Sequence, residues 1–93
     1  MPVSNLTIRV EKPTQNKLAE LGVRMWPIWT KEVSTFDWRY DAEETCFFLE
    51  GEVTVEAAGQ SVRIGKGDLV TFPKGLSCKW RVEKAVRKHY SFA

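Results

Sequence analysis

Three side chains of this sequence, Glu44, Cys46 and Cys78, are candidates for binding a metal or transferring a proton. Glu44 and Cys46 are two residues apart in a largely apolar stretch, and Cys78 follows a later one. Because side chains alternate between the two faces of a β-strand, Glu44 and Cys46 project from the same face. Carboxylates and thiolates are ligands for transition metals such as zinc. Glu44 and Cys46 are therefore a candidate pair, and the fold decides whether Cys78 joins them.

Each of these residues also has a structural interpretation. Buried cysteines often pack as small apolar side chains, and two on neighbouring strands could form a redox-sensitive disulfide. Glu44 in an aromatic cavity would be desolvated, which raises the pKa of a carboxyl group and suits it to acid–base catalysis. Alternatively, Glu44 hydrogen-bonds to Tyr40 or pairs with an inward Lys or Arg, because a buried carboxylate needs a partner. The sequence leaves these alternatives open.

The elements that position these residues are predicted to be mostly short strands. Residues 5–11 alternate apolar and polar side chains as a half-buried strand does, and Pro13 ends the pattern. Thr14 is a candidate N-cap of a short helix that closes at Gly22. From Met25 onward, strands and turn residues follow one another as in an antiparallel barrel or sandwich. The pattern predicts about eight or nine strands in one domain over residues 1–93.

Glycines and prolines set the predicted strand boundaries in the second half of the chain. A tight hairpin turn is expected at Gly51, between Glu50 and Glu52, and a second hairpin at the Gly59 turn. The predicted strands in this half are residues 45–49, 53–56, 61–64, 69–72, 78–82 and 86–92.

Two stretches resemble the paired signatures of the cupin superfamily. In the first, Gly51 follows Glu44 after six residues, the usual spacing between the Glu and the Gly. In the second, Gly67 is followed after five residues by 73–75, a Pro-Lys-Gly turn, and after two more by Cys78, where the usual signature has His. The resemblance implies an all-β, cupin-type double-stranded β-helix, a jelly-roll barrel, with one short N-terminal helix.

Within the superfamily the chain is similar to a small single-domain group related to ethanolamine-utilisation cupins and to the cupin halves of (S)-ureidoglycine aminohydrolase. The strings that carry this similarity are residues 26–29, 44–46, 66–75 and 86–90. If the protein is an enzyme, the resemblance implies small nitrogen-containing substrates and a metal-assisted step. Glu44 is then the candidate catalytic residue, as metal ligand or base.

The resemblance also indicates which residues would face a metal. In a metal-binding cupin, three His and one Glu converge on a transition metal that keeps open positions for substrate. Carried over by spacing, the His positions hold Trp38, Tyr40 and Cys78, and the Glu is Glu44. One carboxylate and one thiolate hold a metal weakly. The candidate set for a divalent transition metal is therefore Glu44, Cys78 and Cys46, and the competing interpretation is a metal-free binding or structural module with a degenerate site.

A small polar molecule inside the barrel is the partner that this interpretation predicts. His89 is the one histidine of the sequence, and Lys88, of opposite parity on the same strand, competes with it for the inward position. The aromatic residues either form a stacking wall for a ligand or fill the core. The candidate ligand-binding residues are Trp38, Tyr40, Glu44, Cys78 and His89.

Charge and composition limit the remaining partners. The formal net charge is only +2 and acidic residues are interleaved with basic ones, so neither nucleic acid nor a membrane surface is predicted as a partner. No apolar stretch approaches the roughly 20 residues that span a bilayer. Without the basic and apolar segments of a secretory signal, a cytoplasmic location is expected. Exposed strand edges predict a homodimer.

Overall fold

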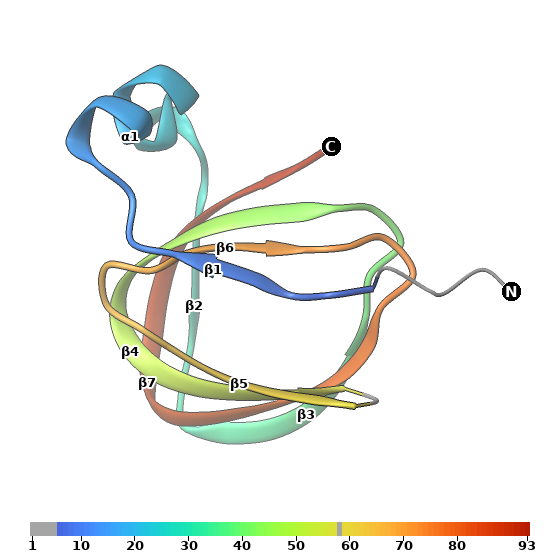
Figure 1. The fold of residues 1–93 in the computed structure, drawn as a ribbon. Coiled ribbons are helices and arrows are strands. Elements are labelled where there is room, and N and C mark those ends of the chain that lie inside the picture. The colour runs from blue at the N-terminus through green and yellow to red at the C-terminus, as the bar shows by residue number, and fades with distance from the viewer. Residues whose placement is uncertain (1–5, 58) are drawn as a thin grey trace, which may run out of the picture.

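The computed structural model describes residues 6–57 and 59–93, and the strands among them form a single antiparallel sheet curled into a barrel (Figure 1). The predicted helix is present outside this barrel: Thr14 caps it, and Gly22 ends it with a φ of 69°. Asn5 of the predicted first strand lies outside the described residues. The elements are β1 (Arg9–Glu11), α1 (Gln15–Leu21), the 3₁₀ helix η1 (Val23–Met25), β2 (Ile28–Lys31), β3 (Ser34–Arg39), β4 (Glu44–Ala57), β5 (Gln60–Gly65), β6 (Leu69–Phe72) and β7 (Ser77–Phe92).

Two long strands, β4 and β7, organise the sheet. They pair with each other over nearly their whole length. The other edge of β4 pairs first with β6 and then with β5, and the other edge of β7 pairs with β3 and then with β2. β1 extends the sheet beyond β6. The all-β jelly-roll fold with one short helix that the sequence predicts is therefore confirmed.

The hairpin turn predicted at Gly51 is wrong, because β4 runs through this residue as a bulge. The register between β4 and β7 shifts three times between Phe48 and Val53. The buried apolar side chains of β4 have even numbers before the bulge, as in Phe48, and odd numbers after it, as in Val53 and Val55. A bulge adds a residue to one strand and so reverses which face each later side chain takes.

The two separate strands predicted at residues 78–82 and 86–92 are also wrong, because β7 is continuous over both. Its buried residues all have even numbers, from Cys78 to Lys88, so a single alternation runs through the strand. The central residues 83–85 are exposed opposite the bulge of β4. Exposure of this turn-like middle, rather than a break in the strand, explains why the pattern suggested two elements.

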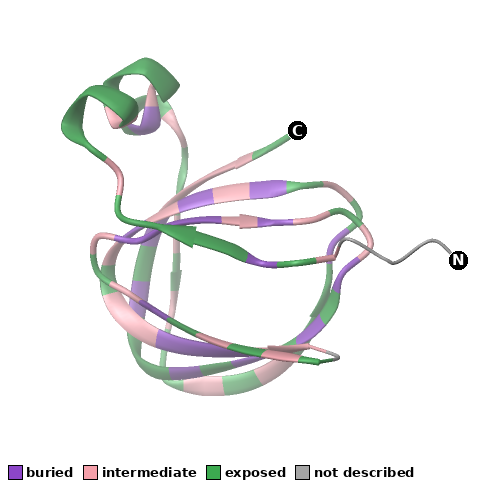
Figure 2. Ribbon diagram, viewed as in Figure 1, coloured by how far each residue is buried: buried purple, intermediate pink, exposed green. Residues whose placement is uncertain are grey.

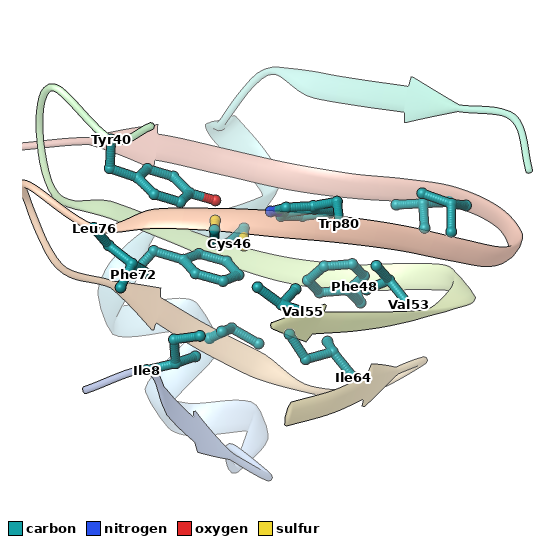
Figure 3. Close-up of a cluster of buried hydrophobic side chains, with 14 residues drawn as sticks. Ile8, Tyr40, Cys46, Phe48, Val53, Val55, Ile64, Phe72, Leu76 and Trp80 are labelled. Carbon is teal, nitrogen blue, oxygen red and sulfur yellow. The ribbon is translucent and has the colours of Figure 1, made fainter. Parts of the chain in front are cut away.

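Stacked aromatic side chains pack inside the barrel, as the close-up shows (Figure 3). Figure 2 marks where the buried residues lie along the strands. Phe72 stacks on Tyr40 with ring centroids 4.9 Å apart and contacts Trp80 at 5.6 Å. Phe48 stacks on the same Trp80 at 6.3 Å. Bulky rings let a short chain fill a barrel with few residues, and offset or tilted pairs add to the apolar stabilisation.

Replacing Gly51 by Ala tests the role of the bulge. Gly51 has a φ of 104°, and a Cβ atom there would lie 2.5 Å from the carbonyl oxygen of Ala85. We expect Gly51→Ala to lower the free energy of unfolding by about 2–5 kcal/mol in urea titrations, from backbone strain plus the clash. Gly75→Ala is the matched control, because its φ is 91° and nothing lies within 4 Å of the added Cβ; only about 1–2 kcal/mol is expected there. Equal losses in the two variants would contradict the proposed close approach.

Candidate functional site

A cavity of about 400 Å³ opens into the barrel and is walled mainly by aromatic rings from β2, β3 and β7. Its polar groups are contributed by Lys31 at the end of β2, Glu44 at the start of β4 and Lys88 on β7, with Tyr40 directly after β3. The aromatic residues of the wall are Trp29, Phe36, Trp38, Trp80, Tyr90 and Phe92. A cavity that combines an apolar wall with a few convergent polar groups is the usual form of a small-molecule site.

Glu44 and Lys88 form a buried ion pair in this cavity. The Lys88 Nζ atom lies 2.9 Å from Glu44 Oε2, and the two side chains are only 4% and 6% exposed. In the strand register Lys88 lies opposite Phe48, so its long side chain runs back along β4 to reach Glu44. Burying either charge alone would be very costly, and each therefore depends on the other.

Three aromatic rings surround the Lys88 ammonium. Its Nζ atom lies 4.8 Å from the ring centre of Trp80, 4.9 Å from that of Trp29 and 5.8 Å from that of Phe48. The negative potential on the face of each ring attracts a cation, most strongly when water is excluded. The rings therefore attract the Lys88 ammonium without taking up its hydrogen-bond donors.

Tyr40 and Trp80 place two further polar groups beside the pair. Burial, and after it the nearby Glu44 carboxylate, raises the pKa of the Tyr40 hydroxyl. Tyr40 therefore keeps its proton and can donate a hydrogen bond. Within the described part of the chain, the buried Trp80 Nε1 has no hydrogen-bond partner. Figure 3 shows the Trp80 nitrogen and the Tyr40 oxygen turned toward each other.

The two cysteines are buried, free thiols near this group. Burial raises the pKa of Cys46 to about 12, and the neighbouring Lys88 only partly offsets this effect. Burial likewise raises the pKa of Cys78 to about 11, opposed by the Trp80 side chain, and the Cys78 Sγ atom donates to the carbonyl oxygen of Trp38 at 3.6 Å. Because metals bind the thiolate, these protonated thiols are poor ligands.

The predicted metal set of Glu44, Cys46 and Cys78 is not assembled. Over residues 6–57 and 59–93, no three His, Cys, Asp or Glu side chains are grouped so that they could hold a metal ion. The carboxylate that would bind the metal already accepts from the ammonium of Lys88. The residues present therefore do not fit the metal centre that the cupin resemblance implies.

The structure brings together some of the predicted ligand-binding residues and separates others. Tyr40 and Glu44 both line the cavity, and Trp38 stands at its rim, 50% exposed and edge-on to Tyr40 at 6.4 Å. Cys78 is buried beneath this group and does not line the cavity wall. His89 projects from the opposite face of β7, with its Nδ1 atom 2.9 Å from the carbonyl oxygen of Trp26. The inward position that the sequence left open between His89 and Lys88 belongs to Lys88.

Sequence reasoning missed the central part that Lys88 plays. The signal was present in the even-numbered alternation Cys78, Trp80, Val82, Val86 and Lys88, which continues through residue 84 without a change of phase. Residues 83–85 interrupt the apolar alternation, so the pattern is typical of two strands and does not reveal this continuity. A lysine at an inward position of an apolar strand needs an acidic partner, and Glu44 was the buried carboxylate already expected.

Comparison with known proteins agrees with the fold. The sequence model of the EutQ-like cupin domain matches residues 18–90. A crystal structure of a DUF861 family protein from Thermotoga maritima is similar to this chain, with 58% identity, a TM-score of 0.92, and coverage of 94% of this chain and 100% of that one. Among curated proteins, no sequence matched significantly.

More distant structures are similar over part of their length. The EutQ protein of Clostridium difficile is 25% identical with a TM-score of 0.65, over 70% of this chain and 52% of that one. A putative ethanolamine utilisation protein Q from Salmonella typhimurium is 28% identical with a TM-score of 0.64, over 70% and 53%. This chain thus spans about half of each EutQ chain.

The chain belongs to the cupin superfamily, in its EutQ-like family. This confirms the superfamily and the small ethanolamine-utilisation-related group that the two sequence signatures indicated. No helix in the described part of the protein is long and apolar enough to cross a membrane.

A double-mutant cycle tests the buried pair. We expect Lys88→Met to lower the free energy of unfolding by about 3–5 kcal/mol, because it leaves the Glu44 carboxylate buried and unpaired. The double variant Glu44→Gln/Lys88→Met removes both charges and is expected to recover most of that loss. Lys84→Met, which removes an exposed lysine paired with Glu52 on the surface, should change stability by less than about 1 kcal/mol. If the losses of Glu44→Gln alone and Lys88→Met alone add up in the double variant, the pairing is contradicted.

Proposed function

We propose that the barrel cavity binds a small organic molecule through a carboxylate or carbonyl oxygen, without a bound metal. The observation that carries this proposal is the buried ammonium of Lys88 at the polar end of an aromatic cavity. An ammonium group has three donors, and Glu44 accepts one of them at 2.9 Å. Buried donors without acceptors are costly, and a ligand oxygen would satisfy them.

The wall of the cavity supports a flat or apolar body for this ligand. Trp29 and Phe36 meet edge-to-face at 6.4 Å, and Trp29 meets Trp80 in the same way at 5.8 Å. Such rings provide both stacking faces and edges for an unsaturated or aliphatic group. The cavity volume of about 400 Å³ suits a molecule of a few to a dozen non-hydrogen atoms.

The competing proposal, a structural module whose barrel binds nothing, accounts less well for these groups. A lysine, a glutamate and an indole N–H gathered in a small barrel cost stability that apolar side chains of similar size would not. Retaining them next to an open cavity is explained more directly by recognition of a polar ligand. A ligand titration distinguishes the two proposals.

Titration with benzoate, followed by tryptophan fluorescence, tests the proposed site, because three tryptophans line the cavity. We expect saturable quenching in wild type that is unchanged by a metal chelator. The charge-free double variant Glu44→Gln/Lys88→Met is expected to bind about 10–100-fold more weakly, since it lacks a charge-assisted hydrogen bond worth about 1.5–3 kcal/mol.

Lys84→Met removes a surface lysine of the same strand and is expected to bind as wild type does. Glu44→Gln alone is expected to tighten benzoate binding, because the competing carboxylate is gone. If a panel of small carboxylates and amides leaves the fluorescence unchanged, or if binding requires added metal, the proposal is wrong.

A further inference from the structure

We propose that Lys88 acts as a nucleophile that forms an imine with a small aldehyde or ketone in the barrel cavity, an inference that rests on the proposed ligand site. Lysines become useful for this chemistry when they are held in a water-poor site beside a group that can take their proton. The Nζ atom of Lys88 has such a group 2.9 Å away in the Glu44 carboxylate.

Lys88 differs from the other lysines of this chain. All eight lie in the described residues, and Lys88 is the one that is buried. The side chains of Lys12 and Lys84 are 75% and 70% exposed, and that of Lys17 is 45% exposed. An exposed ammonium is held charged by water and has no fixed acceptor in a closed site. Lys31 also lines the cavity, with its Nζ atom 5.1 Å from the ring centre of Phe36, but Lys88 is the cavity lysine with a carboxylate oxygen 2.9 Å away.

The proton and bond changes balance with the groups present. The Lys88 ammonium first transfers a proton to Glu44, and the free amine then attacks the carbonyl carbon, so that a C–N bond forms. Glu44 passes this proton to the carbonyl oxygen, and it then relays a second proton from the nitrogen to the new hydroxyl group. The protonated hydroxyl leaves as water, and a protonated imine remains. The overall change converts ammonium and carbonyl to iminium and water, with no oxidant or reductant.

The site stabilises the product for the same reasons that it stabilises the ammonium. The iminium keeps the positive charge of Lys88, so the ionised Glu44 remains its counter-ion. The faces of Trp29 and Trp80, each within 5 Å of the Nζ atom, favour a delocalised cation as they favour the ammonium. The aromatic wall selects small aldehydes and ketones with an apolar body.

Reductive trapping tests this inference directly in the full chain. Wild type is incubated with benzaldehyde and sodium cyanoborohydride near pH 7, digested, and mapped by mass spectrometry. We expect a benzyl adduct on Lys88 that forms at least tenfold faster than on Lys12 or Lys84 and that benzoate suppresses by competition. Lys88→Arg keeps a cation for Glu44 and cannot form an imine, so it should lose this adduct, whereas Lys84→Met, which changes a surface lysine of the same strand, should form it as wild type does. Glu44→Gln should slow trapping tenfold or more, because the proton acceptor is removed.

The outcomes separate this inference from the proposed function. If benzoate binds to wild type but the label spreads over exposed lysines, or spares Lys88, imine formation is refuted and the ligand site stands. If benzoate does not bind and no Lys88 adduct forms, both proposals fail. The positions of the adducts in the wild-type protein test imine formation even if a variant does not fold.

Discussion

One electrostatic constraint underlies this structure: the ammonium of Lys88 and the carboxylate of Glu44 can remain inside the barrel only because each is the partner of the other. Several features of the fold are required for them to meet. The long β4–β7 ladder brings the two strands together, and its bulge at Gly51 lets β4 present Glu44 inward at one end and Val53 inward at the other. The rings around the ammonium then exclude water while leaving one side open to the cavity.

This pair also explains how the chain departs from the metal-binding pattern of its superfamily. Trp38, Tyr40 and Cys78 stand where the signature has histidines, so the ligands of an exchangeable metal are missing. The glutamate of the signature remains, and a fixed cation of the chain itself lies beside it. The Lys88 ammonium thus puts a positive charge next to this carboxylate, and the ammonium can also donate hydrogen bonds. Such a change favours recognition of an oxygen and chemistry on an amine.

The fold could be predicted well because the residues that indicate each element lie close together in the sequence. Thr14 and Gly22 bound the helix, and the spacings around Glu44, Gly67 and Pro73 indicated the barrel. The Gly51 bulge was not predictable in the same way, since a glycine between two glutamates is equally typical of a turn. Only the close approach of the Ala85 backbone, which the sequence does not show, distinguishes the two. The site was half predicted: the inward carboxylate was expected, but its partner lies 44 residues away and depends on the β7 register.

The most direct test of the central claim observes the Lys88 ammonium itself by ¹H–¹⁵N NMR of the lysine side chains near neutral pH. We predict one ammonium signal that is protected from exchange with water, among eight lysines, and that is lost or strongly shifted in Glu44→Gln. A spectrum without a protected ammonium, or with one that Glu44→Gln leaves unchanged, would contradict the account.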